Sequence, residues 1–388
     1  MEKIKNKRIA IIGGGPGGLT LARLLQMNGA DVKVYERDVN KDARMQGATL
    51  DLHEDSGLKA IRAAGLMDAF KENYRPSADK MRVTDKHALI LFDQQTDQVS
   101  EETFGDEGFR PEIDRGPLRK ILLESLQPDT VVWDSHFKTM AEVGDSWEIE
   151  FNNGSFALTD IVVAADGANS KVRPFITPLK PFYSGITIVE GTVYNAEEQT
   201  PDIYKLVNGG KVFAFGDEKS LILSSKGDGS ITFYTGCKTG EIWYKESNID
   251  FNNNSHVKDW FLKEFDGWDS IWLDLIQNAE PHFIPRPQYC MPLNQSWPSH
   301  PNLTMLGDAA HVMPPYAGEG VNMAMLDALE LSNCLLNPEL LDVQSAIASY
   351  ESEMLLRFAE VASLTLEQTE LLHSANAISN MLELFNQY

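Results

Sequence analysis

The chain has 388 residues, of which 43% are hydrophobic and 23% are charged, a composition typical of a folded protein with a sizeable core and not of a disordered chain. Its 34 Lys and Arg against 57 Asp and Glu give a formal net charge of -23. Such a surface repels nucleic acid and anionic membranes, so neither is an expected partner.

The first predicted unit, residues 8 to 36, reads as strand, tight turn, helix and strand. The apolar run Ile9 to Ile12 leads into Gly13-Gly14-Gly15-Pro16-Gly17-Gly18, which satisfies G-x-G-x-x-G, and an apolar helix follows to Asn28. Glycines there permit a tight turn and a close approach of backbone to a pyrophosphate at the helix N-terminus. Glu36 ends the next strand, where a carboxylate accepts hydrogen bonds from an adenosine ribose. The pattern predicts bound FAD or NAD, with a structural glycine turn as the alternative.

A second strand-and-turn unit spans residues 160 to 173. The apolar segment Asp160 to Ala165 runs into Asp166-Gly167, and Ser170 is suited to cap a following helical turn. Taken alone, this segment favours an ordinary capped turn, and only the other two motifs point to a cofactor.

Residues 180 to 280 have a different pattern. Short β-branched and aromatic segments, such as ITIVEGTVY and SITFYTG, are separated by Gly, Asp and Asn turns, which is typical of an antiparallel sheet. This block interrupts the α/β pattern and is predicted to be inserted into it.

A third strand-and-turn unit follows at residues 303 to 322. Leu303 to Leu306 precede Gly307-Asp308, and the stretch continues through His311 and the glycines Gly318 and Gly320 to a predicted helix from Val321. Asp308 is placed to bind a ribityl hydroxyl, and the positive helix end could stabilise negative charge on a reduced flavin. An ordinary strand-loop-helix is the alternative. His311 is a candidate base, although histidine in such a turn more often packs or hydrogen-bonds.

The last segment predicts one long helix over residues 345–388, because it lacks Gly and Pro and repeats apolar residues every three or four positions. The predicted fold is α/β, with a Rossmann-like FAD-binding domain, an inserted mainly antiparallel β substrate domain and a long C-terminal helix. We assign residues 1–75, 100–178 and 282–340 to the first, 76–99 and 179–281 to the second, and 341–388 to a helix bridging both. The helix could instead form a dimer seam, but we predict a monomer.

The sequence gives no indication of a secretory signal, a membrane span, a disulfide framework or a zinc site. The apolar run near the N-terminus is too short for a secretory signal, and no stretch reaches the ~18 apolar residues of a membrane span. Cys237, Cys290 and Cys334 lie far apart, which argues against a disulfide framework or a zinc site. We predict a cytoplasmic protein.

Together the three motifs resemble those of the single-component FAD monooxygenases, the flavoprotein aromatic hydroxylases, in order and approximate spacing over essentially the whole chain. Within that family the stretches ARMQGATLDLHEDSG and MLGDAAHVMPPYAGEGVN are similar to the tetracycline-inactivating monooxygenases. The resemblance implies an NADPH-consuming enzyme that hydroxylates a small aromatic or polycyclic molecule with dioxygen, through a flavin C4a-hydroperoxide.

The resemblance also implies site residues. Arg44 would contact NADPH and the flavin, although it could be a solvated surface charge. The implied cofactor-binding set is Gly13, Gly15, Pro16, Gly18, Glu36, Arg37, Arg44, Asp51, Arg119, Asp166, Asp308, Pro315, Gly318, Gly320, Val321 and Asn322. The implied substrate-binding set is Glu190, Lys211, Phe213, Thr232, Pro315, Tyr316 and Gly318.

Three of the substrate positions depart from the tetracycline enzymes, which carry Gln, Arg and His where this chain has Glu190, Lys211 and Thr232. A pocket that pairs particular polar groups discriminates strongly when those groups change, so the substrate is expected to differ. The alternative is that these three side chains face solvent.

Two further function classes remain open at this stage. One is a flavin reductase or dehydrogenase on the same scaffold, and the other is a non-catalytic flavoprotein that sequesters a ligand. A second G-x-G-x-x-G after residue 18 is absent from the sequence, which fits NADPH as a visiting co-substrate. The flavin supplies the chemistry, so no Ser-His-Asp or metal constellation is needed.

Overall fold

The computed structural model describes residues 3–43, 49–95, 103–106 and 108–386. A five-stranded parallel sheet forms its first half, in the order β17-β11-β1-β2-β7. Strands β1, β11 and β17 are buried on both faces, as the apolar runs predicted, whereas β2 alternates buried and exposed residues. Their bounds are β1 (Arg8–Ile12), β2 (Asp31–Tyr35), β7 (Val131–Val132), β11 (Ile161–Ala164) and β17 (Leu303–Met305).

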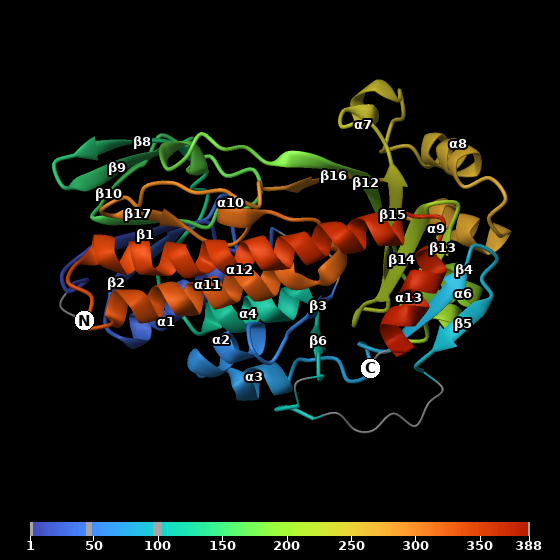
Figure 1. Ribbon diagram of the computed structural model, residues 1–388, viewed down its shortest axis with the longest axis horizontal. Coiled ribbons are helices and arrows are strands. Elements are labelled where there is room, and N and C mark those ends of the chain that lie inside the picture. Colours follow the sequence, from blue (N-terminus) through green and yellow to red (C-terminus); the bar gives the residue numbers. More distant parts are fainter. Residues whose placement is uncertain (1–2, 44–48, 96–102, 107, 387–388) are drawn as a thin grey trace.

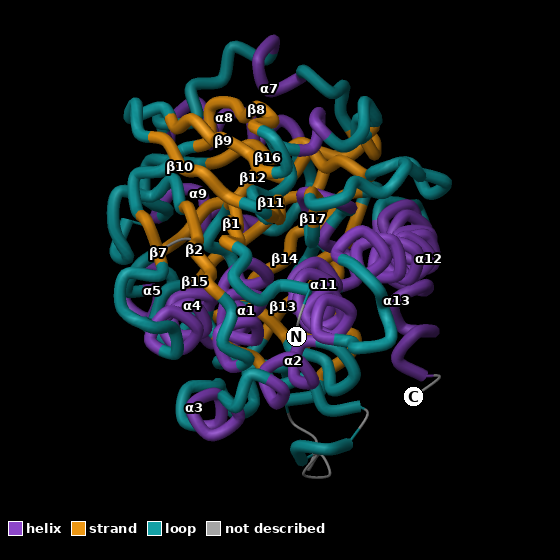
Figure 2. The backbone as a smooth tube through the Cα atoms, turned by 90° about the vertical axis from the view of Figure 1, so that its left-hand side faces the viewer, coloured by secondary structure: helices purple, strands orange, loops and turns teal. Residues whose placement is uncertain are grey.

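The two faces of the parallel sheet are covered differently. Helices α1 and α11 lie on one face, and a three-stranded antiparallel sheet lies on the other (Figure 2). The covering elements are α1 (Pro16–Met27), α2 (Gly57–Ala63), α3 (Met67–Lys71), α4 (Arg115–Glu124), α11 (Glu319–Leu336), β8 (Phe137–Val143), β9 (Ser146–Phe151) and β10 (Phe156–Thr159). Because β1 and β2 pair in parallel and α1 connects them, the predicted βαβ unit at residues 8 to 36 is confirmed.

A seven-stranded sheet forms the second half, in the order β16-β12-β15-β14-β13-β4-β5. Its pairs are antiparallel except β13 with β4, which run parallel. The strands are β4 (Met81–Asp85), β5 (Ile90–Asp93), β12 (Phe182–Val193), β13 (Lys211–Gly216), β14 (Lys219–Ser225), β15 (Ile231–Lys238) and β16 (Ile284–Cys290). The structure thus confirms the α/β fold with an inserted, mainly antiparallel sheet, whereas the exact domain bounds stay a prediction.

One face of the seven-stranded sheet packs against its own helices and forms a second core. Alternate strand residues such as Val212, Ala214 and Phe233 belong to this core, so their sequence neighbours project from the opposite face. The covering helices are α5 (Ala196–Gln199), α6 (Pro201–Val207), α7 (Trp243–Glu246), α8 (Asn254–Glu264), η2 (Ser270–Trp272) and α9 (Leu273–Asn278).

The C-terminal segment corrects one prediction, because it forms two helices and not one. Helix α12 (Val343–Leu372) runs beside α11 toward the seven-stranded sheet, and α13 (Ala377–Asn386) lies over β4 and β13 (Figure 1). The chain turns at residues 373–376, where buried Leu372, Ala377 and Met381 join Val83 and Phe215 in a small core. Burying that apolar set outweighs the helix-favouring local composition.

Short elements connect the two halves: β3 (Leu50–Asp51) pairs with β6 (Glu112–Ile113), and η1 (Arg173–Phe175), α10 (Asp308–His311) and η3 (Pro315–Ala317) follow the motifs. None of the described helices is long and apolar enough to cross a membrane.

Candidate functional site

The glycine turn between β1 and α1 is tightly packed on one side and open on the other. Gly13 has a φ of +114°, and a Cβ on it would lie 2.2 Å from the Ala165 carbonyl oxygen. A Cβ on Gly18 would lie 2.2 Å from the Gly13 carbonyl oxygen. By contrast, a Cβ on Gly15 would meet no atom within 4 Å. The turn therefore needs its flanking glycines for packing and leaves free space at Gly15.

That free space adjoins the N-terminus of α1. Gly15 is the N-cap and Pro16 the first helical residue, the cap makes no side-chain hydrogen bond, and the first turn has no acidic residue. The helix end therefore presents unpaired backbone N–H groups and a positive dipole, which together suit a phosphate.

The residues predicted for the adenosine side meet just beyond β2. Glu36 is 5% exposed, and its two carboxylate oxygens accept hydrogen bonds from the Gly14 amide at 2.6 Å and the Asp38 amide at 3.0 Å. Arg119 donates to Asp38 at 3.1 Å. Arg37 is exposed. Glu36 therefore stands beside the glycine turn, held by two backbone amides.

The two aspartates that follow strands both retain binding capacity. One oxygen of Asp166 accepts from the Lys171 amide at 2.7 Å, while Oδ1 is buried without a hydrogen-bond partner. Asp308 is accessible to solvent yet closely surrounded by protein, and this burial raises the pKa of its carboxyl. Both carboxylates therefore keep an oxygen that can accept a further hydrogen bond.

Sequence reasoning gave no role to Arg173, which ties the second and third motifs together. Its guanidinium donates to the carbonyl oxygens of Ala309 at 2.6 Å, Asp308 at 2.8 Å and Ala168 at 3.1 Å. Ser170 caps this turn by accepting from the Arg173 amide at 2.9 Å, as predicted. The sequence did contain a clue to this role, because Arg173 is the last residue of the second strand-and-turn unit.

His311 has a structural position. It is 1% exposed, its Nε2 lies 2.6 Å from Asp327 Oδ2, and its ring stacks on Phe358. The same Asp327 oxygen accepts from the Gly307 amide at 2.9 Å, and Arg357 donates to the other oxygen at 2.7 Å. His311 therefore helps to fix the Gly307–Asp308 turn and does not face an open site as a base would.

The described residues fit FAD. The open space at Gly15 suits the pyrophosphate, and Glu36 stands where a ribose would lie. The unpartnered Asp166 oxygen and the accessible Asp308 carboxyl offer hydrogen-bond acceptors. Arg44, predicted to contact NADPH and the flavin, lies outside the described residues.

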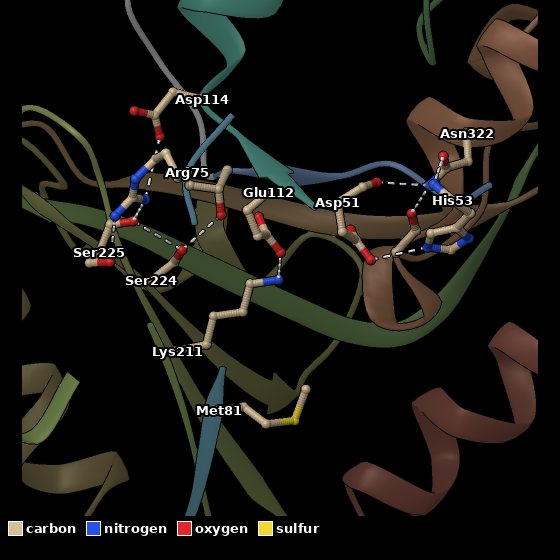
Figure 3. Close-up of polar contacts among 12 residues, drawn as sticks. Asp51, His53, Arg75, Met81, Glu112, Asp114, Lys211, Ser224, Ser225 and Asn322 are labelled. Carbon is tan, nitrogen blue, oxygen red and sulfur yellow. Dashed lines mark hydrogen bonds and ion pairs between the residues drawn. The ribbon is translucent and has the colours of Figure 1, made fainter. Parts of the chain in front are cut away.

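A cluster of charged residues lies where the two halves meet. Its members are Asp51, His53, Glu112, Lys211 and Glu319, and the first four are labelled in Figure 3. His53 Nε2 lies 3.1 Å from Asp51 Oδ2, and its Nδ1 lies 3.4 Å from Glu319. Lys211 forms an ion pair with Glu112. We call these five residues the junction cluster. It places Asp51, predicted for the cofactor, in the same network as Lys211, predicted for the substrate.

Burial and charged partners act in opposite directions on the pKa values of the junction cluster. At Glu112 burial outweighs Lys211 and raises the pKa of the carboxyl, whereas at Asp51 and His53 the partners outweigh burial. Burial would raise the pKa of Asp51, yet His53 and Lys211 lower it to about 2. Burial would lower the pKa of His53, yet hydrogen bonds to Asp51 and Glu319 raise it to about 9. Both groups are therefore ionised near neutral pH.

Asn322 and Gly318 lock the junction cluster to the start of α11. The Asn322 amide accepts from the His53 backbone N–H at 2.9 Å and donates to the Asp51 carbonyl at 2.9 Å. Gly318 has a φ of +70°, and a Cβ there would lie 3.1 Å from both Asp51 carboxylate oxygens. The predicted residues Gly318, Gly320, Val321 and Asn322 thus form the end of α11 that faces β3.

The predicted substrate residues Glu190, Lys211, Phe213 and Thr232 share one face of the seven-stranded sheet, the face opposite the second core. The solvent-facing alternative is wrong for Glu190 and Thr232, which are 5% and 1% exposed. Glu190 accepts from Arg286 at 2.5 Å, and the Thr232 hydroxyl lies 3.2 Å from that of Thr192. The polar groups of Glu190 and Thr232 therefore already have protein partners.

Tyr316 reaches this face from η3, which begins at Pro315. Its hydroxyl lies 3.4 Å from His373 Nε2, and the Ser220 hydroxyl lies 3.0 Å from the same nitrogen. A Cβ on Gly236 would lie 2.3 Å from the Ser220 hydroxyl, so a glycine is required beneath the trio. A cavity of about 670 Å³ opens beside His373, between α12 and the ends of β12 and β15.

The junction cluster makes stability depend on pH. The folded pKa of His53 lies above its unfolded value of 6.5, so its contribution is complete below pH 6.5 and is lost as pH rises through about 9. We expect His53→Gln to lower the free energy of unfolding by about 2–3 kcal/mol at pH 6 and by much less at pH 10. Denaturant titrations at both pH values measure this, with exposed His136→Gln as the control. An equal loss at both pH values would contradict it.

Comparison with known proteins agrees with this geometry. A family model described as an FAD binding domain matches residues 6–123 and 295–365. The chain is 30% identical over 393 residues to monooxygenase asqM of Emericella nidulans, covering 88% of this chain and 86% of that one. The chain belongs to the FAD-dependent monooxygenase family.

Solved structures of this family share the fold. HpxO of Klebsiella pneumoniae, solved with FAD and uric acid, has a TM-score of 0.76 and 21% identity, covering 99% of this chain and 93% of that chain. Tetracycline destructase Tet(51) has a TM-score of 0.67 and 17% identity, covering 95% and 90%. These structures confirm the fold, while the FAD binding domain and the similarity to monooxygenase asqM confirm the predicted family, the enzymatic character and the FAD cofactor.

Proposed function

We propose that this FAD monooxygenase hydroxylates a small aromatic or polycyclic molecule, with NADPH as the visiting reductant. The observation that carries the proposal is the junction cluster. Its Lys211 lies on the polar and aromatic face of the seven-stranded sheet, and its Glu319 begins α11, next to Gly320, where a Cβ would lie 3.9 Å from Asp308 Oδ1. Bound FAD supplies the activation of dioxygen. Substrate, dioxygen, NADPH and a proton then give hydroxylated substrate, water and NADP⁺.

The chain's own residues bind, orient and exclude water. Gly15, Glu36, Asp166 and Asp308 would hold FAD, with Arg37, Arg119 and Asp51 along its length. Glu190, Lys211, Phe213 and Thr232 would line the substrate side, with Pro315, Tyr316 and Gly318 as the wall between substrate and flavin. The polar pairs on this face are already formed, so little reorganisation is needed when a substrate binds.

The test begins with the purified protein. We expect a yellow flavin spectrum, and NADPH oxidation that aromatic and polycyclic phenols, tetracyclines among them, accelerate by at least about tenfold for a true substrate. In ¹⁸O₂ the product should gain one labelled oxygen atom. A protein that cannot be reconstituted with FAD would refute the proposal.

Two outcomes would favour the other function classes. Hydride transfer to a substrate without oxygen consumption would indicate a reductase or dehydrogenase. Tight binding of a ligand that never accelerates NADPH oxidation would indicate a sequestering flavoprotein. Incorporation of oxygen into the product excludes both.

A further inference from the structure

We infer that this monooxygenase selects an uncharged aromatic substrate and discriminates against aromatic carboxylates. The inference rests on the proposed function and concerns the substrate side of the same site. It is carried by the charges that face the expected substrate position, each of which is already paired within the protein.

The first cation is Lys211, whose positive charge is already paired within the protein. Its ammonium pairs with Glu112, a carboxylate that is 1% exposed. Burial alone would lower the pKa of Lys211, but Glu112 and the neighbouring Asp51 raise it. The ammonium therefore stays charged and is held between two carboxylates, with no net positive charge left for a third.

The second cation on the sheet face is also engaged. Arg286 of β16 donates to Glu190 of β12 at 2.5 Å. These residues lie on neighbouring strands and on the same face, because Arg286 is paired in register with Ile188, two positions before Glu190. Glu190 is buried, so an unpaired carboxylate there would be costly and the pair is retained.

The third cation is His53, which lies between Asp51 at 3.1 Å and Glu319 at 3.4 Å. The cations Lys211, His53 and Arg286 therefore meet four carboxylates, those of Asp51, Glu112, Glu190 and Glu319. Lys238, at the end of β15 on the same face, is paired with Glu218 at 2.9 Å. A substrate carboxylate would enter a region with excess negative charge. Like charges in such a partly buried region repel one another.

The sheet face carries hydroxyl groups and an aromatic ring, which suit a neutral aromatic molecule. The hydroxyls of Thr192 and Thr232 lie 3.2 Å apart, and those of Thr49 and Ser224 lie 3.0 Å apart. Each hydroxyl can both donate and accept. The half-buried ring of Phe213 adds an apolar surface beside them. Hydroxyl, carbonyl and ring N–H groups of an uncharged substrate can pair here without displacing an ion pair.

The test compares matched pairs of probes on the FAD-loaded protein: 4-hydroxybenzamide with 4-hydroxybenzoate, and 4-hydroxyquinoline-2-carboxamide with its carboxylate. Binding is measured by the change in flavin absorbance, without NADPH and hence without turnover. We expect at least one amide to bind, and each amide that binds to do so at least about tenfold more tightly than its carboxylate, a factor worth about 1.4 kcal/mol.

The variant Glu112→Gln should release Lys211 and improve carboxylate binding by at least about tenfold, and Lys211→Met added to it should remove the gain. Glu150→Gln, which opens the exposed pair with Lys138 on β8 and β9, is the matched control. Carboxylates that bind wild-type protein as tightly as the amides, or amides that never bind, would overturn the inference. Because binding is read without turnover, that failure is distinct from failure to incorporate oxygen.

Discussion

Replacing Asp327 by Asn is expected to lower the free energy of unfolding by about 3–5 kcal/mol and to weaken FAD binding by at least about tenfold. Asp327 is fully buried, and its carboxylate serves His311 at 2.6 Å, the Gly307 amide at 2.9 Å and Arg357 at 2.7 Å. Asn lacks the negative charge, and its amide group would point a donor at another donor. The buried His311 would then lose the carboxylate with which it pairs, and Arg357 would keep only Glu330.

The effect on FAD follows from the position of Gly307. This residue has a φ of +58° and directly precedes Asp308, so losing its anchor lets the Gly307–Asp308 turn move. Denaturant titration of the apo-protein gives the stability, and quenching of flavin fluorescence gives the FAD affinity.

Glu330→Gln is the matched control for Asp327→Asn. Glu330 is the other carboxylate that Arg357 contacts, at 2.5 Å, but its side chain is 31% exposed. Partly exposed ion pairs contribute little, so this variant should remain within about 1 kcal/mol of wild type and bind FAD normally. Equal losses in the two variants would show that Arg357 alone, and not the anchored turn, matters.

The fold was largely predictable because its signals are local. The apolar run Ile9–Ile12, the glycines after it and Glu36 are adjacent in sequence, and the structure places them as one βαβ unit. The break between α12 and α13 was not predictable in the same way. It depends on Leu372, Ala377 and Met381 packing on Val83 and Phe215, which are distant in sequence.

The same distinction applies to the site. Asp51 and Lys211 were selected for separate roles, and the sequence contains no sign that they share a network, because the contact needs β3, β6 and β13 to converge. His53 was overlooked for this reason, although it is two residues from Asp51. Pairing a charged residue with its partner requires the tertiary fold, whereas recognising a glycine turn does not.

Within the glycine turn, Gly18→Ala is expected to lose both stability and flavin, whereas Gly15→Ala is expected to lose only affinity for FAD. At Gly18 a Cβ would lie 2.2 Å from the Gly13 carbonyl oxygen and 3.3 Å from the Ala165 Cβ, so α1 or the turn must move. We expect about 3 kcal/mol or more of lost stability, together with loss of flavin. Unfolding of the apo-protein measures the first and flavin content the second.

Gly15→Ala is expected to change the affinity for FAD without changing the stability of the fold. A Cβ at Gly15 meets no protein atom within 4 Å, and the residue's φ of -78° is one that alanine adopts readily. Apo-protein stability should therefore change by less than about 1 kcal/mol. FAD affinity should fall by at least about tenfold, because the methyl group occupies the space in which the pyrophosphate approaches the backbone. Gly240→Ala, which also points into open space but lies far along the chain, should change neither quantity. If Gly15→Ala binds FAD as tightly as wild type, the pyrophosphate does not lie against this turn.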